Sequence, residues 1–376
     1  MQYSPLSQVQ QRVQVRAPLP FNVRDHDGTL LLARGRVIET PEQMHALFAR
    51  GALVDLTELQ SLLNPTERVQ QARPEELPGL WTQCLDDLND SLRNSAKEGF
   101  LDALQETTPA VLALVERDKD LAIFQVLRQD GNEHVQYGVT HSTHAAITAY
   151  LVAHRLGWSA DETQRVFKAT LTMNISMLEL QGQLAVQTTP PTPEQREAIK
   201  AHPHFSRLML EISGVTDADW LAAVAHHHEK PDGSGYPAGL RDSGDLAALV
   251  QRADVYTAKL SPRANRDAMA ADKAGRMMFM QEPGHPMVSA LVKEFGVYPP
   301  GCFVKLMSGE TGLVIKRGAT MMAPIVAVVS SPFGASLPQP LRRDTSQRGY
   351  AIHSVLASHG GSARVTPDTL MAVLAA

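Results

Sequence analysis

The sequence predicts a mainly α-helical protein with a small β-containing module at each end. Two observations support this fold class. Between Leu80 and Phe295, helix start signals recur and apolar residues follow helical spacing almost throughout. Towards both ends of the chain, short runs of β-branched and apolar residues flank turns that contain glycine. With 376 residues, of which 43% are hydrophobic, the chain can bury the cores of two or three domains.

Residues 1–61 are expected to form a small α/β module. Phe21–Val23 and Leu30–Leu32 flank the turn Asp25–Gly28, a pattern that is typical of a β-hairpin. We expect a short helix to follow, starting near Pro41 and ending at the next glycine.

A polar stretch separates this module from the rest of the chain. Residues 62–79 contain three prolines, which indicates a linker. Residues 80–296 are expected to form an all-α domain. Capping boxes at Ser159–Glu162 and Thr192–Gln195 mark the starts of two of its helices.

The pattern of the sequence changes again near its end. Phe303–Leu306 and Gly312–Ile315 flank a glycine-containing turn and predict a second hairpin. We therefore expect residues 297–376 to form a small β-rich appendage, closed by a helix near Thr366–Leu374.

Composition argues against several classes of function. The net charge is −5 and aromatic residues make up 5%, so neither a strong basic surface nor a base-stacking platform is expected, and we predict no binding to nucleic-acid polymers. The two cysteines, Cys84 and Cys302, lack the CxxC spacing of a thiolate zinc site. No apolar run approaches the roughly 18 residues of a membrane helix, and no signal peptide is recognisable. We expect a soluble cytoplasmic protein.

The segment His227–Pro237, with the sequence HHEKPDGSGYP, carries the strongest chemical signal. Two histidines at a helix end, next to a tight glycine-containing turn, can present imidazole nitrogens to a borderline metal ion. His141 and His202 lie in other predicted helices, and Asp254 is a carboxylate on an otherwise apolar helix face, where it needs a partner. Taken singly, His141 and His202 are better explained by an ordinary structural role than by metal binding.

This segment resembles the signature of the HD-GYP branch of the metal-dependent HD phosphohydrolases. Three shorter motifs match that family in the same order, namely Thr140–Ser142, Lys200–Pro203 and Arg252–Tyr256. The resemblance covers about residues 120–295. It implies an HD-type helical bundle that holds divalent metal ions and hydrolyses the bacterial messenger cyclic di-GMP.

The resemblance also implies roles for individual residues. The implied metal ligands are His141, His202, His227, His228 and Asp254. The implied substrate-binding residues are those of the GYP loop, Gly235, Tyr236 and Pro237, together with Arg263 and Arg266, which would face substrate phosphates. The family also uses such loops to contact GGDEF-type partner proteins, so a partner of this kind is expected here.

The chain departs from the family at the HD pair itself. The matching segment is Ala169–Met177, where Met173 and Asn174 stand in place of histidine and aspartate, and Met177 stands in place of lysine. An amide carries no charge, so it cannot offset the repulsion between two dications held about 4 Å apart. We therefore expect one divalent ion, either iron, manganese, nickel or zinc, or none.

Three functions fit these observations, and no catalytic residue is assigned. The missing HD pair favours a degenerate HD-GYP protein of cyclic di-GMP signalling, which binds cyclic di-GMP, a related cyclic dinucleotide or a partner with weak or no hydrolysis. The surviving histidines fit an active metal-dependent cyclic di-GMP phosphodiesterase with an atypical metal site. The GYP loop alone fits a docking protein without a working nucleotide site.

Overall fold

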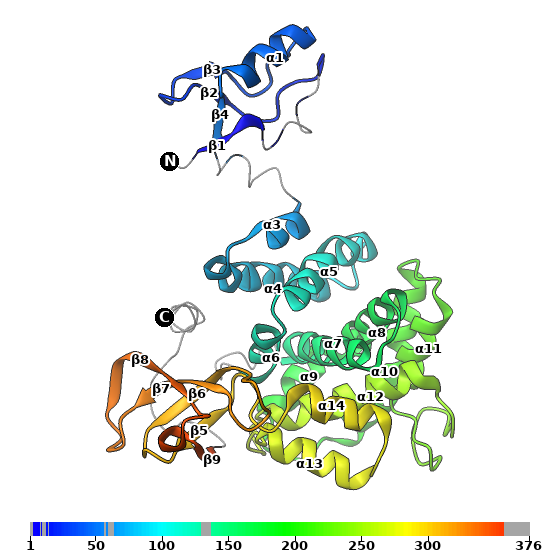
Figure 1. Ribbon diagram of the computed structural model, residues 1–376. Helices are drawn as coiled ribbons and strands as arrows, with labels where there is room; N and C mark the ends of the chain where they lie inside the picture. Colours follow the sequence, from blue (N-terminus) through cyan, green and yellow to red (C-terminus); the bar gives the residue numbers. More distant parts are fainter. Residues whose placement is uncertain are drawn as a thin grey trace. The chain divides into compact units, whose positions relative to one another are not determined.

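The computed structural model describes residues 3–7, 9, 13, 15–55, 58, 64–128 and 137–356. The chain forms two compact units, residues 1–72 and residues 73–376. Each unit carries its own antiparallel sheet (Figure 1). The helix that was expected near Thr366–Leu374 lies outside the described residues.

The first unit is built on a four-stranded antiparallel sheet. Its strands are β1 (Tyr3–Pro5), β2 (Val23–Arg24), β3 (Leu30–Leu32) and β4 (Leu53–Asp55), in the spatial order β1-β4-β2-β3. Helix α1 (Pro41–Ala49) begins at Thr40, which forms a capping box with Gln43. Phe21 and Val54 lie fully buried in the core of the unit. The expected hairpin and helix are both confirmed.

The segment 62–79, which was expected to be a linker, is helical over most of its described part. It holds α3 (Pro65–Gln71), the 3₁₀ turn η2 (Pro74–Glu76) and the first residues of α4 (Leu77–Arg93). Its prolines occupy the first turns of these helices, where the missing N–H of proline removes no hydrogen bond. The division between the two units falls inside this segment, and the finer domain boundaries stay a prediction.

The second unit is mainly a bundle of helices, as the sequence predicts (Figure 1). After α4 these are α5 (Phe100–Arg117), α6 (Lys119–Leu127), α7 (Tyr137–Leu156), α8 (Ala160–Thr172), the 3₁₀ turn η4 (Ile175–Met177), α9 (Leu178–Val186), α10 (Pro193–Ile212), α11 (Ala218–His226), α12 (Gly244–Leu260), α13 (Ala271–Gln281) and α14 (Pro286–Phe295). Among the residues that the structure describes, no helix is long and apolar enough to cross a membrane.

Helix α7 lies at the centre of this bundle. It packs against α6, α8, α9, α12 and α14, and most of its residues are buried. Many of these residues are small, so neighbouring helices can approach closely. At Gly138, for example, an added Cβ would lie 2.4 Å from the carbonyl oxygen of Leu178. His141 projects from this buried helix, which explains why its side chain lies in the interior.

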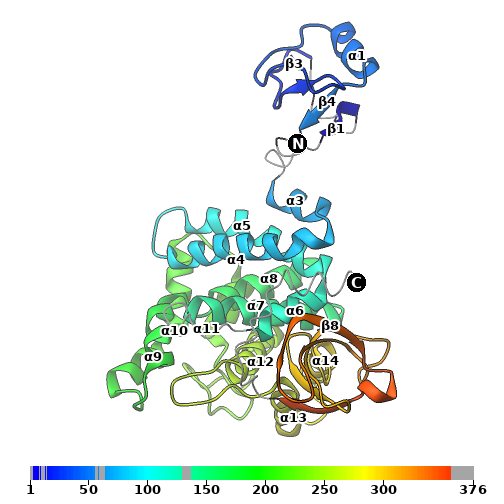
Figure 2. The same ribbon diagram turned by 90° about the vertical axis from the view of Figure 1, so that its left-hand side faces the viewer.

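A five-stranded antiparallel sheet follows the last helix. Its strands are β5 (Phe303–Leu306), β6 (Thr311–Lys316), β7 (Ile325–Ser330), β8 (Ser336–Asp344) and β9 (Ile352–Leu356), in the order β8-β7-β6-β5-β9. The strands curl around a core that includes Val304, Val314 and Val328 (Figure 2). The predicted hairpin is the pair β5–β6, with Phe303 opposite Leu313.

Ion pairs hold this sheet to the helices. Arg317, which follows β6, pairs with Asp120 of α6 and with Glu294 of α14. Glu294 also pairs with Arg155 of α7, and its side chain is only 6% exposed. The β-rich segment therefore belongs to the same compact unit as the helical bundle.

Candidate metal centre

Three histidines from two helices meet in the interior of the second unit. His202 lies on α10, whereas His227 and His228 directly follow the last residue of α11. One ligand nitrogen from each ring lies within 4.8 Å of the other two. His202 and His227 are buried, and His228 is nearly so. The structure therefore brings together three of the five metal ligands that the sequence predicts.

Backbone carbonyls fix the orientation of two of these rings. Nδ1 of His202 lies 2.5 Å from the carbonyl oxygen of Ile199, and Nδ1 of His227 lies 2.8 Å from that of Val224. A ring that donates its Nδ1–H in this way keeps an unprotonated Nε2. The two Nε2 atoms lie 3.1 Å apart, so two lone pairs face each other and a shared cation would satisfy both.

The surroundings keep these imidazoles neutral. Burial, together with the neighbouring His227, lowers the pKa of His202 to about 3. Burial likewise lowers the pKa of His227, and it holds the pKa of His228 well below its ordinary value. Neutral imidazole is the form that binds a metal ion, so all three rings are ready to do so near neutral pH.

The other two predicted ligands form a separate pair. Nε2 of His141, on α7, lies 2.7 Å from Oδ1 of Asp254, on α12. Burial by itself would raise the pKa of Asp254, but the hydrogen bond and the electrostatic interaction with His141, together with the proximity of His228 and His227, outweigh it and hold the pKa below its ordinary value. Asp254 is thus a carboxylate that lies beside the three histidines without belonging to their group.

The residues present fit a single divalent cation. Three neutral imidazole nitrogens suit zinc, iron, nickel or manganese, and three protein ligands leave a coordination position open. The negative charge of Asp254 would partly balance the charge of the ion.

The GYP loop folds back onto the histidines. The ring of Tyr236 stacks on that of His228, with 4.6 Å between the ring centroids. At Gly235 an added Cβ would lie 2.4–2.5 Å from backbone atoms of the preceding turn, so no larger residue fits there. Pro237 is exposed beside them. The loop therefore forms one wall of the centre.

Glu229 organises this loop, a role that sequence reasoning missed. Its buried carboxylate accepts hydrogen bonds from the backbone N–H groups of Ala238, at 2.6 Å, and Leu240, at 2.9 Å. Gln251 on α12 donates to the carbonyl oxygen of Glu229. The sequence did contain a signal for this role, namely an acidic residue between a histidine pair and a glycine-rich turn. Such turns leave backbone N–H groups that need hydrogen-bond acceptors.

The two predicted phosphate-binding arginines differ in their surroundings. The guanidinium of Arg263 lies 5.2 Å from the centroid of the Tyr137 ring, and its Nε donates to the Tyr137 hydroxyl. The Tyr137 ring in turn stacks on His141. Arg266 instead donates to the carbonyl oxygen of Ala258. Tyr137 therefore connects Arg263 to the His141–Asp254 pair, which the sequence did not reveal.

Comparisons with known proteins agree with this architecture. Residues 125–281 match the HD domain family. This chain therefore carries a segment that is similar to HD domains. It is 36% identical to a cyclic di-GMP phosphodiesterase from Pseudomonas aeruginosa, over 35% of this chain and 33% of that protein. It is 27% identical to the cyclic di-GMP phosphodiesterase response regulator RpfG from Xanthomonas campestris, over 57% of this chain and 56% of that protein.

A third relative is named for a different substrate. It is the 3'3'-cGAMP-specific phosphodiesterase 3 from Vibrio cholerae, which is 29% identical over 45% of this chain and 35% of that protein. The chain thus spans between a third and just over a half of the length of these three relatives. The predicted resemblance to the HD-GYP group is confirmed.

The segment that follows α8 offers neither an imidazole nor a carboxylate. Met173 is fully buried, Asn174 is 1% exposed and Met177 is half-buried. Oδ1 of Asn174 has no hydrogen-bond partner within the described part of the chain. The nearby hydroxyl of Ser176 donates to the carbonyl oxygen of His202, so this segment lies against α10 at the metal centre.

Proposed function

We propose that this protein is a degenerate HD-GYP receptor of cyclic di-GMP signalling, with one metal ion and weak or no hydrolysis. One observation supports this most strongly. His202, His227 and His228 form a compact group of neutral ligands, whereas His141 and Asp254 are bonded to each other. The ligands that would hold a second ion are therefore not gathered around the first.

Electrostatics disfavours a paired metal site here. Two unit charges 4 Å apart interact by about 4 kcal/mol at an effective dielectric constant of ~20, so two dications repel by about 16 kcal/mol. A bridging carboxylate normally offsets this repulsion. We infer that Met173 and Asn174 occupy the positions of the family's HD pair, where a thioether and an amide supply no negative charge.

A single ion would still give the site a chemical role. When bound, it would be iron, manganese, nickel or zinc, and it would attract a phosphate oxygen or acidify a bound water. The protein's own contribution is to hold three imidazoles in place and to close one side with Tyr236. Arg263 makes no ion pair with a described residue, so its guanidinium is available to a substrate phosphate.

The relatives support the proposed ligand class. They are named for cyclic di-GMP and 3'3'-cGAMP, which are both cyclic dinucleotides with two phosphodiester groups. We propose cyclic di-GMP or a related cyclic dinucleotide as the ligand of this chain. Contact of the GYP loop with a GGDEF-type partner protein stays a prediction.

An active phosphodiesterase with one metal ion is the second candidate. The three histidines leave a coordination position open, and one ion is enough to generate hydroxide near neutral pH. This candidate predicts metal-dependent formation of linear product that His228→Ala abolishes.

One experiment separates the two candidates. The full chain is incubated with cyclic di-GMP and Mn²⁺ or Fe²⁺, products are resolved by chromatography, and binding is measured on the same samples by calorimetry. We expect binding with little product, and product formation at least about tenfold faster in the Met173→His/Asn174→Asp variant. The matched control is Met173→Leu/Asn174→Ser, which alters the same positions without adding a ligand.

The opposite result is equally clear. If wild type releases linear product as fast as the variant that carries the restored pair, and chelation abolishes it, the protein is a phosphodiesterase. If neither binding nor turnover is measured, both candidates fail.

A further inference from the structure

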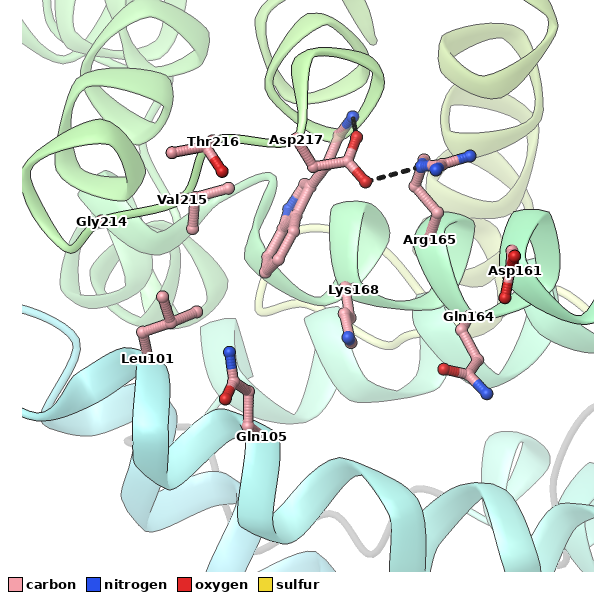
Figure 3. A pocket seen from close by; sticks show the side chains of 11 residues that line it. Leu101, Gln105, Asp161, Gln164, Arg165, Lys168, Gly214, Val215, Thr216 and Asp217 are labelled. Atoms are coloured by element: carbon pink, nitrogen blue, oxygen red, sulfur yellow. Dashed lines mark hydrogen bonds and ion pairs between the residues drawn. The ribbon is translucent and has the colours of Figure 1, made fainter.

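A cavity of about 320 Å³ lies between α5, α8 and the loop that leads into α11. Figure 3 shows that its floor comes from α5 and its roof from α8 and this loop. None of its lining residues belongs to the histidine group. The volume is at the lower end of the range for small-molecule sites, which suits a ligand with about one ring.

One end of the cavity is apolar. Leu101 of α5 and Val215 of the loop face each other there (Figure 3). Trp220 also lines the cavity. Nε1 of Trp220 donates to the hydroxyl of Thr172, at 2.9 Å. The indole is therefore held in a fixed position, and this end offers a rigid apolar surface.

The middle of the cavity carries an unneutralised positive charge. The ammonium of Lys168 lies 5.9 Å from the centroid of the Trp220 ring, and no described carboxylate lies within ion-pair distance of it. Figure 3 shows Lys168 directed from α8 towards α5, with the amide of Gln105 directed back towards it. A donor amide and a cation thus converge on the same space.

The other cation of the cavity is already neutralised. Nε of Arg165 lies 2.7 Å from Oδ2 of Asp217, and a further nitrogen lies 3.7 Å from Asp219. Asp217 also caps α11 by accepting from the N–H of Trp220. Lys168 is therefore the cation that a bound anion would meet.

We propose that this cavity is a second ligand site, which binds a small organic carboxylate with an apolar body. The body contacts Leu101, Val215 and Trp220, and the carboxylate accepts hydrogen bonds from Lys168 and Gln105. A charge-assisted hydrogen bond of this kind is about twice as strong as a neutral one, so the charge of the ligand decides its affinity.

The site is separate from the metal centre. Its residues lie on α8 from Asp161 to Lys168 and at the start of α11, whereas Met173 and His227 follow the ends of the same two helices. Lys168 precedes Met173 by five residues, which is roughly 7.5 Å along the helix. A ligand can therefore occupy the cavity while the three histidines hold a metal ion.

The test compares two molecules of the same shape. Benzoate and the neutral benzamide are titrated into the metal-free full chain, and dissociation constants are measured by ligand-observed NMR. We expect benzoate to bind at least about tenfold more tightly than benzamide. Lys168→Gln should remove this preference but keep benzamide binding, which shows that the cavity is intact. The control Lys273→Gln, on α13, should keep the preference.

A third variant locates the site. Benzoate affinity should be unchanged in His228→Ala, because the metal centre takes no part in binding. The proposal is overturned if neither molecule binds, if both bind equally, if Lys168→Gln keeps the preference, or if His228→Ala loses benzoate. All four outcomes are independent of whether the chain binds a cyclic dinucleotide.

Discussion

At the scale of single residues, the metal centre depends on where each imidazole directs its two nitrogens. His202 and His227 each direct Nδ1 to a carbonyl of their own helix, so both Nε2 atoms face the centre. His141 instead directs Nε2 to Asp254. A histidine therefore acts as a metal ligand or as a hydrogen-bond partner, depending on which atom lies next to each of its ring nitrogens.

We predict that His202→Ala weakens Mn²⁺ or Zn²⁺ binding at least about tenfold, because it removes one of three ligands. The matched control is His204→Ala, two residues further along α10 but exposed. Calorimetric titration of the metal into the apo-protein measures both. Equal losses in the two variants would remove His202 from the centre.

These residues also mark the limit of what the sequence reveals. The string HHEKPDGSGYP predicted that His227, His228 and the loop lie side by side, because these residues are neighbours in the sequence. The sequence grouped His141 and Asp254 with them, but only the packing of α7 on α12 shows that the two bond to each other. His141 and Asp254 are 113 residues apart in the sequence, so the hydrogen bond between them cannot be predicted from sequence spacing.

At the scale of secondary-structure elements, the buried helix α7 brings polar groups into the core. His144 is 6% exposed, and its Nδ1 has no partner among the described residues. Burial lowers the pKa of His144 to about 3, with a contribution from His141. The unfolded chain therefore binds a proton below about pH 6.5, where the folded chain does not.

We predict that this histidine makes the apo-protein less stable in mild acid. Between pH 7 and pH 5 the proton uptake of the unfolded state costs about 2 kcal/mol for one such group, and the free energy of unfolding falls accordingly. His144→Gln should lose about that much of the pH dependence, as measured by urea unfolding at both pH values. His154→Gln, exposed on the same helix, should not. An unchanged slope in His144→Gln would show that His144 is protonated in the folded state.

The positions of helix starts explain why the segment 62–79 was expected to be an irregular linker but is largely helical in its described part. Its three prolines, Pro65, Pro74 and Pro78, are typical of linkers, yet each stands in the first turn of a helix. The capping residue Asn64 gave a competing signal, since its side chain accepts from Glu67 and Glu67 accepts from it in return. Proline content alone does not distinguish a helix start from an irregular segment.

At the scale of the whole molecule, the second unit joins a helical bundle to a sheet. Arg317 makes this junction by pairing with Asp120 and with the buried Glu294. The sequence predicted both parts but gave no sign of the junction, because it depends on residues almost 200 positions apart. The β-rich segment thus belongs to the same compact unit as the helical bundle.

We predict that Arg317→Gln lowers the free energy of unfolding of this unit by about 2–3 kcal/mol, because it removes the arginine partner of Asp120 and one of the two arginines that pair with the buried Glu294. The loss should appear in one transition that is followed by circular dichroism for helix and sheet together. Arg342→Gln, at an exposed position in β8, serves as the control. Separate transitions for helices and sheet would contradict a single unit.

The orientation of His202 and His227 has a consequence for the two helices that carry them. Because each ring is tied to a carbonyl of its own helix, the 3.1 Å between their Nε2 atoms follows directly from the distance between α10 and the end of α11. An ion held between the rings would work as a clamp that sets this helix spacing. Binding of an ion would then make the helical bundle more rigid, whether or not the protein hydrolyses a nucleotide.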